Sequence, residues 1–312
     1  MSHGIRQWLR IERNTADLER AVAFHRDALG FCIDDANAAP PAWTLLPGLC
    51  DAAPRCAQLA LGAQTLLLTH FPDAAPYPRD GAANTTDFQH CAIVVDDMHA
   101  ACDRVLRHGA VPITRGRPQT LPPSTGPVTA FKFRDPDGHP LELIAFPAGT
   151  GDPVWPSMHT GGPTLGIDHS AISVSDVARS MLFYELLGLH VTARGVNRGV
   201  AQDRLDGLDD VEVDVIAMQG TARTPHLELL GYRRPRGRAM GSTALTDVAA
   251  DRLVWLAGHV DVLLDALGDG GFAYAIVSSG FIGGATVALL RDPDGHRLVL
   301  NESVSRNPSS RA

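Results

Sequence analysis

Two histidines and two glutamates recur in matching positions of the chain, and their side chains are of the kind that binds divalent metals. His90 begins the segment HCAIVVDD, and His169 begins the similar segment HSAISVSD. Each histidine is followed by a glutamate between two leucines, Glu142 after 52 residues and Glu228 after 59. Imidazole and carboxylate groups are common ligands of Zn²⁺ and related ions. An ionised carboxylate is costly to bury unpaired, so a metal would explain these glutamates, although outward-facing side chains would explain them too.

These positions belong to an internal repeat. RDPDGHPLELIAF begins at Arg134, and RDPDGHRLVLNES begins at Arg291, 157 residues further on. The two histidine segments are 79 residues apart, about half of that period. The two periods divide the chain into four units, which predicts a tandem duplication. In both DPDG segments proline presets φ and glycine tolerates positive φ, so we expect turns that leave His139 and His296 exposed.

Each unit has the pattern of a strand, a helix and three further strands. In the third unit the alternation of HSAISVS predicts a strand, and apolar residues at helical spacing after Asp176 predict a helix that closes with Gly188. Later strands are expected from Glu212 and from His226, with a short one around 190–193. The expected fold class is therefore α+β, built from four βαβββ modules.

The modules group into two halves. We expect one domain over residues 1–147 and a second over residues 164–304, each with two modules. Residues 148–163 are rich in Pro and Gly and lack periodicity, which is typical of a linker. The polar residues 305–312 are expected to form a tail.

Composition limits the partners and the compartment. The chain has 27 Lys+Arg against 35 Asp+Glu and a net charge of -8, so it lacks the basic surface that nucleic-acid binding requires. It also contains no apolar run near the roughly 18 residues that span a bilayer, so no membrane partner is expected. Its 5 cysteines are odd in number and never spaced as a C-x-x-C pair, which favours reduced thiols in the cytoplasm.

The βαβββ repeat, ADLERAVAFHRDALGF, DHSAISVSD and RDPDGHPLEL resemble the vicinal oxygen chelate superfamily. That superfamily includes glyoxalase I, extradiol dioxygenases, methylmalonyl-CoA epimerases and bleomycin-resistance proteins. The resemblance implies that two modules form one barrel-like cleft, so the chain would have two such clefts. It also implies two metal-ligand positions in each module, one on the first strand and one on the last.

Only the second and third modules have ligands at both positions. The first-strand position lies seven residues before the residue that opens the helix, and the last-strand position lies in the L-E-L triplet. The two positions hold His90 and Glu142 in module two, and His169 and Glu228 in module three. In modules one and four, which lack ligands, they hold Arg10 and Leu67, and Arg252 and Val299, respectively. If module two pairs with three, and one with four, a single cleft collects two His and two Glu. Pairing of sequence neighbours would instead leave one His and one Glu in each cleft, so we predict the crossed pairing.

The empty cleft has a separate interpretation. Arg10 and Arg252 occupy the positions that histidine has elsewhere, and both would point inward. They could bind an anionic ligand there. Structural ion pairs would account for them equally well.

The His2Glu2 set resembles that of glyoxalase I enzymes and implies a metal-dependent isomerase or lyase. Its substrate would be a small molecule with vicinal oxygens, and Glu142 and Glu228 would transfer protons next to a carbonyl. The cofactor is expected to be one divalent ion, with Ni, Zn, Mn, Co and Fe all compatible with these ligands. Because the duplication supplies both modules of the cleft, a monomer would suffice, and a homodimer stays open.

Two alternatives remain. An Fe(II) extradiol dioxygenase would use two His and one Glu, but by resemblance it draws two ligands from module four, where Arg252 and Val299 stand. A metal-free binding protein of the bleomycin-resistance type would need none of these side chains as ligands.

Overall fold

The computed structural model describes residues 4–51, 53–122, 127–155, 162–223, 225–239, 241 and 243–302. Within them each quarter of the chain forms one module of the βαβββ type, as predicted. Module one contains β1 (Ile5–Thr15), α1 (Leu18–Leu29), β2 (Cys32–Asp35), the short 3₁₀-helix η1 (Ala42–Leu45), β3 (Arg55–Leu61) and β4 (Gln64–His70). Module two contains β5 (Gln89–Val94), α2 (Met98–Arg107), β6 (Val111–Pro112), β7 (Gln119–Thr120), β8 (Thr129–Arg134) and β9 (Pro140–Ala145).

The second half repeats this order with one insertion. Module three contains β10 (Gly166–Ser173), α3 (Val177–Leu186), β11 (His190–Arg198), α4 (Val200–Asp206), β12 (Glu212–Gln219) and β13 (His226–Arg234). Module four contains β14 (Arg252–Ala257), α5 (Val260–Asp269), the 3₁₀-helix η4 (Ala273–Ala275), β15 (Ile276–Ile282), β16 (Ala285–Arg291) and β17 (Arg297–Glu302). The inserted element is α4, between the first two strands that follow the module's main helix.

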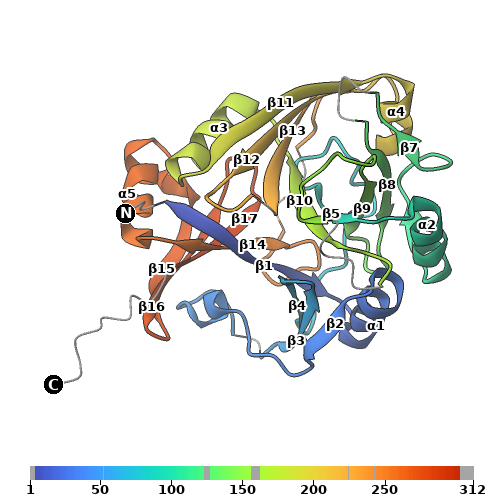
Figure 1. Ribbon diagram of the computed structural model, residues 1–312. Helices are drawn as coiled ribbons and strands as arrows, with labels where there is room; N and C mark the ends of the chain where they lie inside the picture. The colour runs from blue at the N-terminus through green and yellow to red at the C-terminus, as the bar shows by residue number, and fades with distance from the viewer. Residues whose placement is uncertain are drawn as a thin grey trace.

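Strand pairing crosses between the two halves of the chain. One sheet has eight strands in the order β15-β16-β17-β14-β1-β4-β3-β2, so it joins module four to module one. The other has nine, in the order β11-β12-β13-β10-β5-β9-β8-β6 with β7 paired to β8, and it joins module three to module two (Figure 1). The crossed pairing predicted from the ligand positions is therefore confirmed. Within the described residues neither sheet closes into a barrel, so each pair of modules forms an open sheet instead of the barrel that was predicted.

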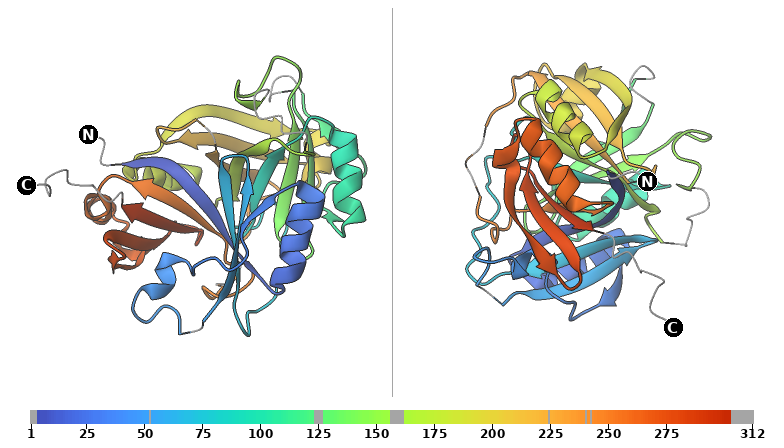
Figure 2. Two further views of the ribbon diagram at one scale, coloured as in Figure 1. Left: turned by 60° about the horizontal axis from the view of Figure 1, so that its bottom comes forward. Right: turned by 90° about the vertical axis from the view of Figure 1, so that its left-hand side faces the viewer.

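The helices pack within each half instead. Figure 2 shows α1 beside α2 and α3 beside α5. Arg104 on α2 donates a hydrogen bond to the carbonyl of Asp27 on α1, at 2.7 Å. Arg179 on α3 donates to the Tyr274 hydroxyl next to α5, at 2.9 Å. The fold thus ties the halves together by sheets and ties each half internally by helices, while the domain boundaries given above stay a prediction.

Local sequence explains where the main helices begin. Asp17, Asp97 and Asp176 precede α1, α2 and α3, and each carboxylate accepts a hydrogen bond from the backbone N–H three residues later. Such caps satisfy a backbone donor that a helix start otherwise leaves free. The strand before each cap leads directly from the first-strand ligand position into the helix. The seven-residue spacing in the sequence therefore reflects one repeated strand-to-helix connection.

Both DPDG segments are turns, but the histidines after them are buried. Asp135 accepts hydrogen bonds from the backbone N–H groups of Asp137, Gly138 and His139, which fixes the turn. His139 Nε2 lies 2.8 Å from the carbonyl oxygen of Asn14 on β1. In the fourth module His296 Nε2 lies 3.0 Å from the carbonyl oxygen of Ser173 on β10. The expectation that both were exposed is wrong, because each turn folds against the first strand of the preceding module.

A buried ion pair lies next to the first of these turns. Arg13 on β1 donates from Nε and Nη2 to Asp251 Oδ2, at 3.0 and 2.9 Å. His139 Nδ1 lies 3.2 Å from the other oxygen of Asp251. Burial opposes the charge of Asp251, yet Arg13 and His139 outweigh burial and hold the pKa of that carboxyl well below its usual range. The network links module one, the turn of module two and the start of module four.

No helix among the described residues is long and apolar enough to cross a membrane.

Candidate metal centre

The crossed sheet brings the four predicted ligand residues to one cavity. His90 is on β5 and His169 is on β10, the two antiparallel strands at the middle of the nine-stranded sheet. Glu142 on β9 and Glu228 on β13 come from the parallel neighbours of those strands. All four side chains line a cavity of about 540 Å³. The shared cleft predicted for modules two and three is therefore present.

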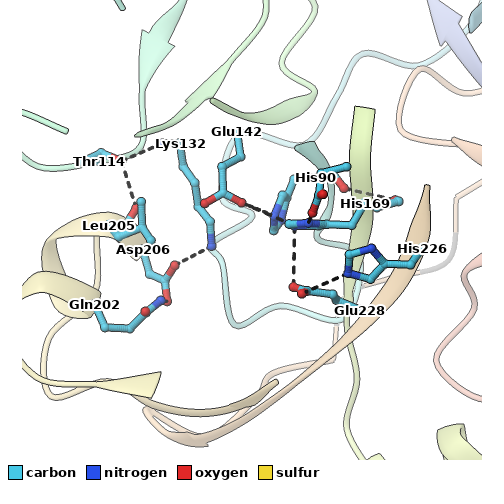
Figure 3. Close-up of polar contacts among 12 residues, drawn as sticks. His90, Thr114, Lys132, Glu142, His169, Gln202, Leu205, Asp206, His226 and Glu228 are labelled. Carbon is cyan, nitrogen blue, oxygen red and sulfur yellow. Dashed lines mark hydrogen bonds and ion pairs between the residues drawn. The ribbon is translucent and has the colours of Figure 1, made fainter. Parts of the chain in front are cut away.

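Close contacts join the four side chains in a chain of alternating imidazoles and carboxylates (Figure 3). His90 Nε2 lies 2.8 Å from Glu142 Oε2. His169 Nε2 lies 3.7 Å from the same Glu142 oxygen and 3.6 Å from Glu228 Oε2. The ligand atoms of His90, Glu142 and His169 all lie within 4.8 Å of one another. Glu228 joins the cluster only through its neighbours, so it is the outlying member.

Burial and neighbouring charges together shift the pKa values of these side chains. Burial disfavours the imidazolium of His169, but Glu228 and the other carboxylates around it outweigh burial and raise its pKa well above the usual value. Burial also opposes ionisation of Glu142, yet Lys132 and the two imidazoles hold the pKa of this carboxyl well below its usual range. Burial is the main cause of a lowered pKa for His90, and the positive charge of Lys132 lowers it further. The cluster thus contains ionised carboxylates beside a neutral and a cationic imidazole.

Glu228 differs from Glu142 in its surroundings. The side chain of Glu228 is 20% exposed and that of Glu142 is 8% exposed. Burial opposes the charge of Glu228, while His169 and His226 lower its pKa to about 2. Glu142 has a short contact with His90, whereas the polar contacts of Glu228 to His226 and His169 are 3.5 and 3.6 Å long. Of the two carboxylates, Glu228 is the less restrained.

The residues present fit a divalent ion. The two imidazoles and two carboxylates are the donor types that such ions accept, and they face one another across a few ångströms. Asp168 Oδ2 lies 2.9 Å from His169 Nδ1, which leaves Nε2 directed at the two glutamates. A carboxylate in this place fixes the orientation of a metal-binding histidine. His90 Nδ1 is buried without a hydrogen-bond partner among the described residues, so Nε2 is the atom it directs into the cluster.

Sequence reasoning missed two side chains of the cluster. Asp168 directly precedes His169, and His226 lies two residues before Glu228 on the same strand. Asp168, His169 and His226 form a second group whose ligand atoms lie within 4.8 Å of one another. The alternation of β13 would have placed His226 on the same face as Glu228. Asp168 gives no such signal, because the strand pairing is irregular between Ile167 and His169.

Lys132 and Asp206 were missed as well. Lys132 on β8 is the cross-strand partner of Glu142 on β9, and it lines the same cavity. Its Nζ donates to Asp206 Oδ1 at 2.7 Å, with both side chains buried. Asp206 Oδ2 accepts from Gln202 Nε2 at 2.8 Å and from the Tyr232 hydroxyl at 2.9 Å. Asp206 ends α4, an insertion that no repeat in the sequence reveals.

The second sheet has an internal carboxylate where an anionic ligand was considered. Arg10 Nη2 lies 2.6 Å from Glu12 Oε1, and Trp43 Nε1 donates to Glu12 Oε2 at 3.0 Å. Arg252 is fully buried, with its guanidinium 4.0 Å from the centre of the Trp43 ring. Burial lowers the pKa of Arg252 to about 9, and Glu12 is the largest charge that counters this. Arg10 thus pairs with a carboxylate of the chain itself, which favours the ion-pair interpretation for this residue. Arg252 donates to Asn14 Oδ1 at 3.2 Å and to the carbonyl of Ala250 at 2.8 Å, and the anion site stays a prediction.

Leu67 and Val299, at the remaining ligand positions, are buried apolar residues.

Comparisons with known proteins agree with this fold. A family model described as Glyoxalase/Bleomycin resistance protein/Dioxygenase superfamily matches residues 8–143 and 166–300, one match in each half, as a tandem duplication requires. A search of curated proteins found no match.

Several solved structures share the fold. A mutant of glyoxalase I from Zea mays has a TM-score of 0.67 at 20% identity, over 96% of this chain and 93% of that one. Glyoxalase I from Zea mays has a TM-score of 0.64 at 20% identity, over 95% and 92%. A candidate dioxygenase from Bacillus subtilis has a TM-score of 0.58 at 12% identity, over 96% and 86%.

At these identities the structural likeness concerns the fold, whereas the family model spans most of the chain in two copies. The resemblance to the vicinal oxygen chelate proteins is therefore confirmed. The chain belongs to the glyoxalase/bleomycin resistance protein/dioxygenase superfamily.

Proposed function

We propose that the chain is a metal-dependent isomerase or lyase that moves a proton next to a carbonyl of a small substrate with vicinal oxygens. The observation that carries this proposal is the position of His169 Nε2, 3.7 Å from Glu142 and 3.6 Å from Glu228. Two carboxylates from two modules therefore converge on one imidazole nitrogen. His90, Glu142, His169 and Glu228 would hold one divalent ion.

The two glutamates take different roles. When bound, a divalent ion supplies an electrophile for the two oxygens of the substrate. Glu142 stays in place as an ionised ligand, because His90 contacts it at 2.8 Å and Lys132 lies beside it. Glu228 is more exposed and less restrained, so it takes the proton from carbon and returns it to the neighbouring position. General acid–base catalysis of this type contributes roughly 10²- to 10⁴-fold to the rate.

The remaining polar groups support the two glutamates. Asp168 orients His169, and His226 lies 3.5 Å from Glu228 Oε1 at the cavity wall. Apolar side chains such as Val213, Val215 and Leu230 line the same cavity. They exclude water from the substrate and so strengthen the electrostatic interactions within the site.

Hydrogen exchange tests the proposal separately from net turnover. Small α-hydroxycarbonyl compounds are incubated in deuterated solvent with metal-loaded protein, and loss of the carbon-bound hydrogen is followed by NMR. Glu228→Gln should abolish exchange while it keeps most of the metal, and Glu142→Gln should lose metal first. Glu185→Gln, on the exposed face of α3, serves as a control and should behave like the wild type. Wild-type exchange in Glu228→Gln with metal bound would exclude this role for Glu228.

One observation supports a second candidate function, an Fe(II)-dependent extradiol dioxygenase. The compact group is His90, Glu142 and His169, a set of two imidazoles and one carboxylate that would hold Fe(II) and would leave positions for a catechol and O2. This function predicts oxygen uptake by the Fe(II)-loaded protein with catechols, whereas the isomerase or lyase predicts none. A protein that binds no divalent ion after reconstitution would instead favour the metal-free binder.

A further inference from the structure

The cavity has a buried cation, Lys132, beside the proposed metal ligands, and its ammonium is not itself a metal ligand. Lys132 lines the cavity, and its ammonium lies between Asp206 and the imidazoles (Figure 3). Its only hydrogen bond among the described residues is the 2.7 Å contact to Asp206. An ammonium has three N–H donors, so two remain for a group in the cavity.

Asp206 lies behind the ammonium and is fully used by the protein. Its side chain is 0% exposed and does not line the cavity, whereas Lys132, Gln202 and Tyr232 all do. Gln202 and Tyr232 occupy the oxygen that Lys132 leaves free. An anionic group in the cavity would lie closer to the ammonium of Lys132 than to the carboxylate of Asp206. Because Coulomb energy falls with distance, attraction by Lys132 would exceed repulsion by Asp206.

The position of Lys132 along the sheet is fixed by its neighbours. It pairs with Glu142 across β8 and β9, so the ammonium lies on the same face of the sheet as the proposed ligands. Its backbone N–H donates to Thr114 Oγ1 at 2.8 Å, and Thr114 Oγ1 in turn donates to the carbonyl of Leu205 on α4 at 3.1 Å. The lysine is therefore held at one distance from the metal ligands by both the sheet and α4.

We infer that Lys132 binds an anionic oxygen of the substrate, so that the substrate is an acid with an apolar body and two chelating oxygens. This inference rests on the proposed function and specifies its substrate class. Much of the cavity wall is apolar, including Val213, Val215 and Leu230, and an unpaired carboxylate there would be costly. Among the described residues Lys132 is the buried member of the two Lys or Arg side chains that line the cavity, so such a charge can be compensated there, and a neutral isostere would leave its free donors unpaired.

The test compares two probes that differ only in charge: a catechol with a propanoate side chain and the same catechol with a propanamide side chain. Their dissociation constants are measured by calorimetry with the Zn²⁺-loaded and the metal-free protein. The dissociation constant of the amide divided by that of the acid should be higher in the wild type than in Lys132→Met, by roughly tenfold or more. Arg198→Gln removes an exposed charge from β11 outside the cavity and should leave the ratio unchanged.

A second variant controls for the effects of misfolding in Lys132→Met. Lys132→Met leaves Asp206 buried without its cation, so Lys132→Met combined with Asp206→Asn restores neutrality and should show the same loss of preference for the acid. An unchanged acid-to-amide ratio in both variants, or no binding of the acid to the wild type, would overturn the inference. Metal content is measured separately: a protein without bound Zn²⁺ contradicts the proposed function, while the probe ratio in that metal-free protein still decides the role of Lys132.

Discussion

His90 and Glu142 lie on neighbouring parallel strands, and His90 Nε2 is 2.8 Å from Glu142 Oε2 although 52 residues separate them in the chain. The same relation between first and last strands recurs in module three, where Ala171, two residues after His169, pairs with Glu228. Crossed pairing then places both His–Glu sets in one cavity.

Replacing His90 should weaken metal binding while the fold persists. His90→Ala removes one of the three side chains whose ligand atoms lie closest together. Even the loss of a residue that only supports a metal ligand typically lowers metal affinity 10- to 100-fold. We expect a loss of about 100-fold or more, measured by competition with a chelator. His190→Ala, on the exposed start of β11, is the matched control and should retain wild-type affinity. Equal affinities in the two variants would remove His90 from the ligand set.

Metal affinity should rise with pH near neutrality. The pKa of His169 is raised well above 6.5 by Glu228, Asp168 and Glu142 against the effect of burial, so a metal must displace its proton. Each displaced proton makes affinity increase roughly tenfold per pH unit below that raised pKa. Calorimetry in buffers of different ionisation enthalpy should detect proton release on binding. Affinity independent of pH between 6 and 8, or proton uptake, would contradict this assignment.

The same shift has a consequence for the metal-free protein. A raised pKa means that protonated His169 stabilises the fold below the unfolded value of about 6.5, and that this contribution is lost as pH rises through the higher folded value. In urea unfolding of the protein after removal of metal by a chelator, the contribution of His169 to the free energy of unfolding should therefore decline at alkaline pH. His169→Gln should remove that part of the pH dependence.

Breaking the buried pair of Arg13 and Asp251 should strongly destabilise the protein. Both side chains are buried, and removal of the guanidinium leaves a carboxylate with His139 as its remaining close partner. Loss of one member of a buried pair typically costs 3–5 kcal/mol, so Arg13→Met should lower the free energy of unfolding by about that amount. Arg26→Met breaks an exposed pair with Asp27 and should cost less than about 1 kcal/mol. Similar losses in both variants would refute the proposed importance of burial.

The helix cap at Asp176 gives a smaller and more local effect. Its carboxylate accepts from the backbone N–H of Arg179 at the start of α3. Asp176→Ala should cost about 1 kcal/mol in urea unfolding, and Asp176→Asn should cost only a few tenths because the amide oxygen can also accept. A loss in the asparagine variant as large as in the alanine variant would point to charge rather than capping.

Much of the fold and the cluster could be predicted because the repeat exposes them. The period of 157 residues defines the modules, and the empty positions at Arg10, Leu67, Arg252 and Val299 make only the crossed pairing chemically sensible. The repeat could not reveal α4 with Asp206, which occurs once, and therefore not the pairing of Lys132. Nor could turn propensity show that His139 is buried, because its burial depends on a contact with Asn14 more than a hundred residues away. Such long-range contacts follow from module packing, which local patterns do not encode.

The central claim, that His90, Glu142, His169 and Glu228 form one metal centre, is tested most directly by metal stoichiometry. The purified chain is reconstituted with Zn²⁺, Ni²⁺, Mn²⁺, Co²⁺ or Fe²⁺, freed of loose ions, and analysed for metal per chain beside His169→Ala. We predict one tightly bound ion per chain in the wild type and none in the variant. No bound ion in the wild type, or one that persists in His169→Ala, would contradict the claim.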